Sequence, residues 1–224
     1  EMPEPFVGTG RGIKFLVDLS TGQKTGLYLD QLQNYEEVAK FARGRRVLDC
    51  FCNQGGFALA CAKAGAASVT AVDISEDAIA SVRRNAELNG VQVEAIAENA
   101  FDFLKRESDA VRNGADPKWD MIILDPPSFT RNKKSLNGAL RGYKEIHLRA
   151  MQMLPVGGML SSFSCSHHIS STLFRQTICE AAVDGHSTLR LVTTHGQSPD
   201  HPVLLNIPET EYLKGFTFEM VPGR

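Results

Sequence analysis

The feature that most constrains the fold is a regular alternation of short apolar segments and longer amphipathic segments between residues 47 and 220. Short apolar runs predict strands, and longer runs with apolar residues three or four positions apart predict helices. The predicted strands are 47–51, 68–72, 93–97, 119–124, 159–163, 189–193 and 216–220, and the predicted helices are 57–63, 76–89, 101–112, 139–154 and 171–183. Strands that alternate with helices form βαβ units, so we expect an α/β fold on a mostly parallel sheet.

The first forty residues do not follow this pattern. Two extended runs, Lys14–Asp18 and Leu27–Asp30, flank a glycine-bearing turn at Thr21–Gly26 and predict a β-hairpin. We therefore divide the chain into an N-terminal hairpin and linker region, residues 1–38, and a main domain, residues 39–224.

Charge and cysteine content exclude several classes of protein. With 24 basic and 26 acidic residues the net charge is −2, which argues against a uniformly basic nucleic-acid coat but allows a local basic patch. No apolar run approaches the roughly 20 residues of a membrane helix, so we expect no membrane partner. Five cysteines do not suggest a disulfide framework, and we expect a cytoplasmic protein. Cys50 and Cys52 lack a second close pair of Cys or His, so we expect no metal.

Ligands of parallel sheets bind at the carboxyl ends of the strands, so the residues after each strand are the candidates for a binding site. Gly55 and Gly56 allow a backbone turn to approach a ligand closely, although a plain strand-to-helix turn is the alternative. Asp73 lies 24 positions after Asp49, where an acidic residue can bind ribose hydroxyls or merely cap the next helix. Asn99 and Phe101 suit an adenine edge and face, with helix capping again the alternative.

These three loops together predict an adenosine pocket without a phosphate loop. The fingerprint G-x-G-x-x-G, which serves a pyrophosphate, is absent, and this disfavours a dehydrogenase. S-adenosylmethionine is the common cofactor that fits such a pocket.

The fourth and fifth predicted strands end in residues that suit a flat base. In Asp125–Phe129 two prolines fix the backbone, and Asp125 can accept a hydrogen bond from an exocyclic amine or ring N–H. Cys165 follows the next strand and would face the same cleft, as a nucleophile or as an inert core thiol. The other four cysteines, Cys50, Cys52, Cys61 and Cys179, are interpreted as core thiols. His167 and His168 are either bases or solvated loop residues.

A local basic segment is concealed by the neutral total. Residues 131–149 carry six basic side chains and one acidic side chain, Glu145, for a net charge of +5. The basic residues are Arg131, Lys133, Lys134, Arg141, Lys144 and Arg149. They suit a phosphate backbone beside the cleft, or form an ordinary solvated helix face.

Several motifs resemble one known family over about residues 14–220. The matching segments are Gln23–Gly26, Asp30-Gln31, Asp49–Phe57, Asp125–Phe129, Arg141–Lys144, Ser164–Ser166, Asp200–Pro202 and Glu209–Gly215. Together they resemble the bacterial ribosomal RNA large subunit cytosine-5 methyltransferases of the RlmI type. The resemblance implies a class I methyltransferase fold, which is a seven-stranded sheet with one reversed strand and helices on both faces. It also implies S-adenosylmethionine as methyl donor and an RNA cytosine as acceptor.

Site residues follow from the strand ends and this resemblance. We expect Cys165 and Asp125 to be catalytic. The expected cofactor-binding residues are Gln31, Asp49, Phe51, Asn53, Gly55, Gly56, Phe57, Asp73, Ile74, Ser75, Asn99, Ala100, Phe101, Asp125 and Pro126. The expected substrate-binding residues are Pro127, Ser128, Phe129, Arg141, Tyr143, Lys144, His168 and Lys214.

The chain departs from the family in three ways. Family members usually carry an upstream PUA-type RNA-binding domain, so we expect either a fragment or RNA affinity from elsewhere. Leu32 stands where an arginine is frequent, and Ser128 stands where other RNA cytosine-5 methyltransferases have a second cysteine. The oligomeric state stays open, with a homodimer as one option.

We hypothesise that the Cys165 thiolate adds to carbon 6 of cytosine, so that carbon 5 can attack the methyl group. Asp125 would hold the N3/N4 edge of the base, and His168 or water would remove the carbon 5 proton. The alternatives are N-methylation of an exocyclic amine of an RNA base and a non-catalytic RNA- or adenosine-binding module.

Overall fold

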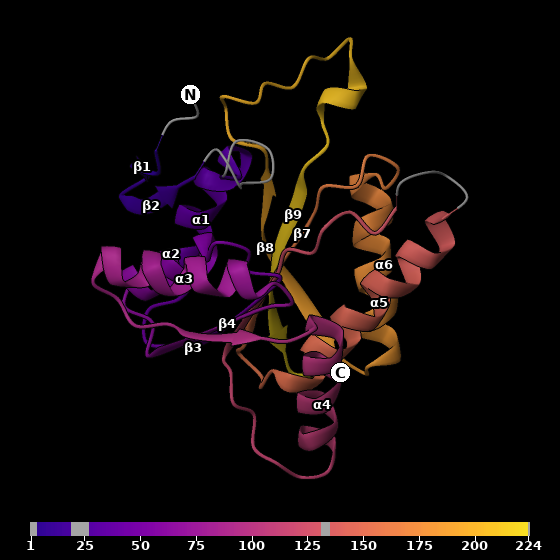
Figure 1. Cartoon of the computed structure of the whole chain (residues 1–224). Helices are drawn as coiled ribbons and strands as arrows, with labels where there is room; N and C mark the ends of the chain where they lie inside the picture. Colours follow the sequence, from indigo (N-terminus) through magenta and orange to yellow (C-terminus); the bar gives the residue numbers. More distant parts are fainter. Residues whose placement is uncertain (1–3, 19–26, 131–134, 224) are drawn as a thin grey trace.

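The computed structural model describes residues 4–18, 27–130 and 135–223. Seven strands form one sheet in the spatial order β5-β4-β3-β6-β7-β9-β8 (Figure 1). Their bounds are β3 Arg46–Cys50, β4 Ser68–Asp73, β5 Glu94–Ala97, β6 Met121–Leu124, β7 Met159–Ser164, β8 Thr188–Gly196 and β9 Lys214–Val221. β9 runs antiparallel to both of its neighbours, and the other ladders are parallel. The expected α/β class, with a mostly parallel seven-stranded sheet and one reversed strand, is confirmed.

Helices cover both faces of this sheet (Figure 1). Their bounds are α1 Leu32–Ala39, α2 Gly56–Lys63, α3 Glu76–Asn89, α4 Ala100–Arg112, α5 Leu136–Met153 and α6 Ser171–Asp184, with short 3-10 turns at Leu29–Gln31 and Pro208–Thr210. One hydrophobic core lies between the sheet and α4, α5 and α6, and a second lies between the sheet and α1, α2 and α3.

The central strands read as continuous apolar runs because both of their faces are buried. In β6, Ile122 and Leu124 pack into the core beneath α4, α5 and α6, whereas Met121 and Ile123 pack into the core beneath α1, α2 and α3. Successive side chains of a strand point to opposite faces, so one short segment supplies apolar surface to both layers.

The winding of the chain reverses between β3 and β6. From β3 the chain proceeds outward to β4 and β5 on one side, and it then returns to β6 and continues through β7 on the other side. The loops after β3 and β6 therefore diverge at the carboxyl edge of the sheet. A crevice for a ligand forms at such a switch in strand order.

An N-terminal hairpin is present, and the strand expected at Lys14–Asp18 is confirmed as β2, but our prediction of its partner strand at Leu27–Asp30 was wrong. β1, Phe6–Gly10, pairs with β2, Ile13–Val17, around Arg11 and Gly12, whose φ angles are +50° and +76°. Two positive φ angles are typical of a tight two-residue hairpin turn, yet Arg-Gly is not the usual sequence signal for one. Leu29–Gln31 is a 3-10 turn instead of a strand, and the expected turn at residues 21–26 lies outside the described residues. The domain boundary at residue 38 stays a prediction.

We expect Gly215→Ala to destabilise the sheet where β9 crosses β7. A Cβ at Gly215 would lie 2.4 Å from Cδ1 of Phe163, a fully buried ring, so the added methyl should lower the free energy of unfolding by about 1–3 kcal/mol. Gly196→Ala, on neighbouring β8, is the control, because a Cβ there meets nothing within 4 Å. Urea denaturation measures both changes, and equal effects of the two substitutions would contradict the close approach at Gly215.

Candidate functional site

Asp49, near the end of β3, is fully buried and anchors the first predicted cofactor loop. Its Oδ2 accepts a hydrogen bond from the backbone N–H of Ala58 in α2, at 2.9 Å, whereas its Oδ1 is buried without a hydrogen-bond partner in the described part of the chain. Burial raises the pKa of Asp49 well above its usual value. A buried carboxylate oxygen without a partner fits a polar group of a bound ligand.

The backbone between Asp49 and α2 turns sharply. Phe51, Asn53 and Gly55 all have positive φ angles, of +62°, +48° and +84°. A Cβ at Gly56 would lie 2.3 Å from the ring of Tyr35, so α2 begins on a residue that must lack a side chain. Phe57 is buried against Tyr35, with ring centroids 4.7 Å apart. Its side chain therefore packs in the core under the loop-to-helix turn.

Asp73, at the end of β4, ties its own loop to the first one. Its Oδ2 accepts from the backbone N–H of Asn53 at 2.9 Å, and its Oδ1 accepts from the N–H of Ser75 at 3.0 Å. The helix cap expected as an alternative for Asp73 is supplied by Ser75, whose Oγ accepts from the N–H of Ala78 in α3. Asp73 is only partly buried and Ile74 beside it is exposed, so both can face a ligand.

The third loop combines a helix cap with an aromatic surface. Asn99 caps α4, since its Oδ1 accepts from the N–H of Phe101 at 2.9 Å, and Ala100 is buried in the first turn. The Phe101 ring lies 6.0 Å from the ring of Phe51 and 5.5 Å from that of Phe129. Side chains that follow β3, β5 and β6 therefore form one aromatic cluster at the predicted adenosine pocket.

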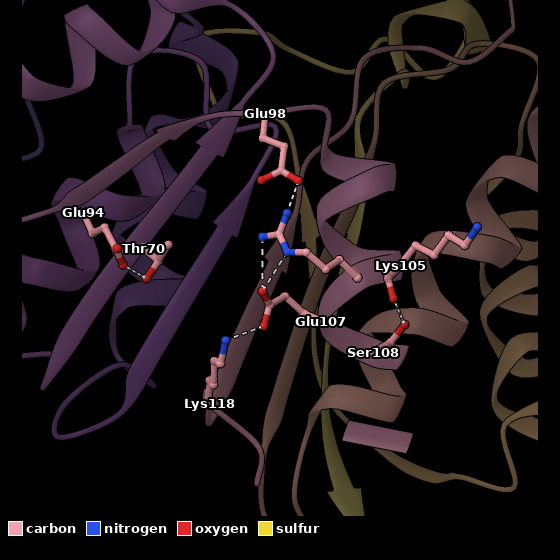
Figure 2. Close-up of polar contacts among 8 residues, drawn as sticks. Thr70, Glu94, Glu98, Lys105, Glu107, Ser108 and Lys118 are labelled. Atoms are coloured by element: carbon pink, nitrogen blue, oxygen red, sulfur yellow. Dashed lines mark hydrogen bonds and ion pairs between the residues drawn. The ribbon is translucent and has the colours of Figure 1, made fainter. Parts of the chain in front are cut away.

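A network of ion pairs fixes α4 beside this loop (Figure 2). Arg106 in α4 binds Glu98, which follows β5, and also Glu107. The ammonium of Lys118, which lies shortly before β6, is 2.7 Å from Glu107. The network ties the middle of α4 to the residue after β5 and to the segment before β6, and it engages one oxygen of Glu98.

Asp125, at the end of β6, lies next to a residue from the N-terminal part of the chain. Gln31 donates from Nε2 to Oδ2 of Asp125 at 3.0 Å, and its Oε1 accepts from Nδ2 of Asn34 at 2.6 Å. Burial, together with the nearby charge of Asp30, raises the pKa of Asp125 to about 7, although the Gln31 hydrogen bond opposes this shift. Asp125 is thus divided between its protonated and ionised forms near neutral pH.

The loop after β6 is joined to the loop after β7. Ser128 Oγ donates to the carbonyl of Thr130 at 2.8 Å and lies 3.0 Å from Ser166 Oγ. Pro126 and Pro127 fix the backbone of this loop, because the proline ring restricts φ. Pro126 is buried, whereas Pro127 is exposed to solvent. Phe129 packs on Tyr143 with ring centroids 4.6 Å apart.

Cys165 is the partly exposed cysteine at this edge of the sheet, directly after β7. Cys50, Cys52 and Cys61 are buried as expected, and burial raises the pKa of each thiol. The core interpretation was wrong for Cys179, which is exposed on α6.

Tyr143 and Lys214 were expected to bind substrate, but the structure buries both of them. The Tyr143 hydroxyl lies 3.0 Å from Ser164 Oγ and 3.2 Å from Ser166 Oγ, so it braces the segment that carries Cys165. Lys214 donates from Nζ to the carbonyl of Ser166 at 2.7 Å. A role for Tyr143 in direct contact with RNA is therefore contradicted by its complete burial.

Two of the three described cations of the predicted basic patch are neutralised. Lys144 pairs with Asp184, the last residue of α6, at 2.8 Å. Arg149 pairs with Asp109 and with Glu145. Arg141 and His168 are exposed and remain available to a substrate, and the other basic residues, Arg131, Lys133 and Lys134, lie outside the described residues.

Sequence reasoning assigned no role to Tyr28, Asp30 and Tyr212, which the fold brings to the site. Tyr212 donates from its hydroxyl to Oδ2 of Asp30 at 2.7 Å, and its ring lies 5.6 Å from that of His167. Burial, with the charges of Asp125 and Cys165 next, raises the pKa of Tyr28. Asp30 and Tyr212 lie in the family motifs quoted above, but 182 positions separate them, and their contact emerges only from the fold.

Comparison with known proteins agrees with the fold described above. A family model described as S-adenosylmethionine-dependent methyltransferase matches residues 4–206. The chain belongs to this family. Its fold, its family and the cofactor of that family, S-adenosylmethionine, agree with our expectations. In the described part of the chain, no helix is long and apolar enough to cross a membrane.

Curated relatives support the narrower resemblance. This methyltransferase chain is 41% identical over 225 residues to "Ribosomal RNA large subunit methyltransferase I" of Erwinia tasmaniensis, covering 99% of the chain and 56% of the relative. It is 42% identical over 219 residues to the protein of the same name from Shewanella denitrificans, covering 96% and 54%. The chain thus spans about half the length of these relatives.

Solved structures support the fold and the cofactor. A crystal structure of a methyltransferase complexed with SAH, SMU.776, superposes with a TM-score of 0.84 at 28% identity, covering 98% of this chain and 57% of the other. A methyltransferase from Agrobacterium tumefaciens superposes with a TM-score of 0.75 at 22% identity, covering 98% and 71%, which supports the fold alone.

The two aspartates that flank β6 should have opposite effects on stability. Folding raises the pKa of Asp125 to about 7, so its ionisation destabilises the folded chain as pH rises from about 4, the unfolded pKa, toward 7. Asp125→Asn should therefore raise the free energy of unfolding at pH 8 by about 1–2 kcal/mol, and by much less at pH 5. This gain is smaller than the free energy that corresponds to the whole pKa difference, because Asp125 is partly exposed to solvent.

Asp120→Asn is the matched control. Arg46 binds Asp120 through two guanidinium nitrogens and lowers the pKa of that carboxyl to about 2. Its stabilisation is present above about pH 4 and is lost as pH falls through 2, so the substitution should destabilise by about 1 kcal/mol at pH 8. Urea denaturation at both pH values measures this, and destabilisation by Asp125→Asn at pH 8 would contradict the raised pKa.

Proposed function

We propose that the chain catalyses transfer of a methyl group to carbon 5 of a cytosine in large-subunit ribosomal RNA, through a covalent adduct with Cys165. The observation that carries this proposal is a partly exposed cysteine directly after β7, which pairs with β6, the strand that Asp125 follows, at the edge of the sheet that also holds the expected cofactor loops. Relatives named as large-subunit ribosomal RNA methyltransferases support the choice of substrate.

The residues after β3, β4 and β5 fit S-adenosylmethionine. The unpartnered Oδ1 of Asp49 and the glycine turn at Gly55 and Gly56 suit the amino-acid part, where a polar group needs a partner and the backbone must come close. Asp73 and the adjoining exposed Ile74 suit the ribose and the adenine, beside the aromatic cluster. The bound cofactor supplies the methyl group.

Asp125 holds the target base. Near pH 7 its carboxyl group exists in both protonation states, so it can accept a hydrogen bond from the N4 amine or donate one to N3. Gln31 fixes its orientation, and Pro126-Pro127 keep the loop rigid. The base reaches this site only from a single strand or by flipping out of a helix.

Cys165 acts as the nucleophile. Its thiolate forms a bond to carbon 6 of the ring, and the electron pair displaced from the C5–C6 double bond makes carbon 5 nucleophilic. After methylation a base removes the proton from carbon 5, the double bond re-forms and the thiolate leaves. Exposed His168 or a water molecule serves as that base.

RNA binds across the open side of this edge. Arg141 is an exposed cation on α5, and Pro127 and Ser128 form the exposed tip of the base-holding loop. The chain spans about half the length of the named relatives, so the RNA contacts proposed here concern this half alone.

Cys165→Ala should abolish formation of 5-methylcytidine, with a loss of rate of about a thousandfold or more, because no other partly exposed thiol of the described residues follows a strand at this edge. Cys179→Ala is the control, since Cys179 is exposed on α6 away from the strand ends. The assay uses labelled S-adenosylmethionine, undermodified ribosomal RNA and nucleoside mass spectrometry.

RNA containing 5-fluorocytidine provides an independent measurement. Carbon 5 then carries no removable proton, so the adduct should persist on the wild-type chain and be absent from Cys165→Ala. An N-methylated nucleoside as product, or full activity of Cys165→Ala, would overturn the proposed mechanism.

A further inference from the structure

Lys214 places a buried positive charge beside the proposed nucleophile. It begins β9, where it pairs in register with Ser164 of β7, and its Nζ donates to the carbonyl of Ser166 at 2.7 Å. The side chain thus runs along the backbone from the residue before Cys165 to the residue after it. Only 8% of Lys214 is exposed, so its position is fixed by the sheet.

Burying an ammonium group costs free energy unless the group is hydrogen-bonded and lies near a negative charge. Burial lowers the pKa of Lys214 to about 8, and the negative charges of Cys165 and Glu211 act in the opposite direction. Below pH 8 the group is therefore mainly charged. Its acceptor is a neutral carbonyl, so much of its field is left to act on Cys165, the residue between its two contact points.

The other titratable groups described around Cys165 supply no buried positive charge. Tyr28, Tyr143 and Tyr212 come from three separate elements, and burial raises the pKa of each phenol, which keeps it neutral near pH 7. Asp125, at the neighbouring strand end, opposes a second negative charge when it is ionised. His167 and His168, in the loop of Cys165 itself, are exposed to solvent.

We infer that Lys214 is a positioning residue whose ammonium group holds Cys165 in the thiolate form before substrate arrives. The thiol proton leaves to solvent, and the ammonium keeps its own proton and neutralises the sulfur. This role rests on the proposed function for its catalytic meaning, but its effect on the thiol can be measured without any methyl transfer.

The test measures the rate of alkylation of Cys165 by iodoacetamide from pH 6 to pH 10, with each cysteine followed by peptide mass spectrometry. Lys214→Gln keeps a hydrogen-bond donor but removes the charge, so the midpoint of the Cys165 profile should rise by about one pH unit and the rate at pH 7 should fall about tenfold. Lys214→Arg keeps the charge and should retain most of the wild-type rate.

The chain contains its own controls. Exposed Cys179 should show the same pH profile in every variant, and buried Cys50, Cys52 and Cys61 should stay protected as long as the chain is folded. Where the buried thiols of Lys214→Gln become reactive, Lys214→Met, which keeps the apolar stem, replaces it.

An unchanged Cys165 midpoint in a folded neutral variant would overturn the inference, and so would equal losses in Lys214→Arg and Lys214→Gln. A thiol effect at Lys214 combined with full methylation by Cys165→Ala would retain the inference about ionisation and reject the proposed function. The two failures are therefore distinguishable.

Discussion

The reversal of strand order between β3 and β6 is the constraint on which the rest of the site depends. It places Asp49 and Asp125 at the carboxyl ends of adjacent parallel strands, and β7 then adds Cys165 one strand further along. The donor site that we propose over β3, β4 and β5 and the acceptor site that we propose over β6 and β7 follow from this order. The strand order alone therefore determines at which edge of the sheet the proposed site lies.

Environment gives similar side chains different properties along this edge. Burial raises the pKa of Asp49 and of Asp125, whereas Arg46 lowers the pKa of Asp120, at the other end of β6, and keeps it ionised. Asp73 uses both oxygens to fix backbone loops. A carboxyl group that is kept partly protonated costs stability, and a costly group at a strand end is typical of a functional site.

The strands and helices from β3 onward could be predicted because local signals agreed with the fold. The helix at Glu76–Asn89 is bounded as expected, since Ser75 caps it and Gly90 has the positive φ that ends it. α1 was missed because its polar Asn34 is buried, bound to Gln31 and to the carbonyl of Gly196, so the residue does not mark an exposed face.

The parts of the candidate site that each lie in one loop could be predicted from the sequence. Cys165, Asp125 and the glycine turn were identified from strand ends, because a parallel sheet gathers those ends together. The supporting contacts of Tyr143 and Lys214 were not, because burial depends on packing between distant segments. Their residue types suggested RNA contacts, and the structure uses them to hold the loop that carries Cys165.

The segment before α1 reaches the proposed acceptor site because the region between β8 and β9 holds that segment in place. The carbonyl of Asp30 accepts from the N–H of Ser198, and its carboxylate accepts from Tyr212, just before β9. These bonds secure the turn from which Gln31 reaches Asp125. Tyr212 is two residues before Lys214, so one short stretch supports both Asp125 and Cys165. A disturbance there should reach Asp125 and Cys165 together, whereas a disturbance of the loops after β3 and β4 should affect the proposed donor site alone.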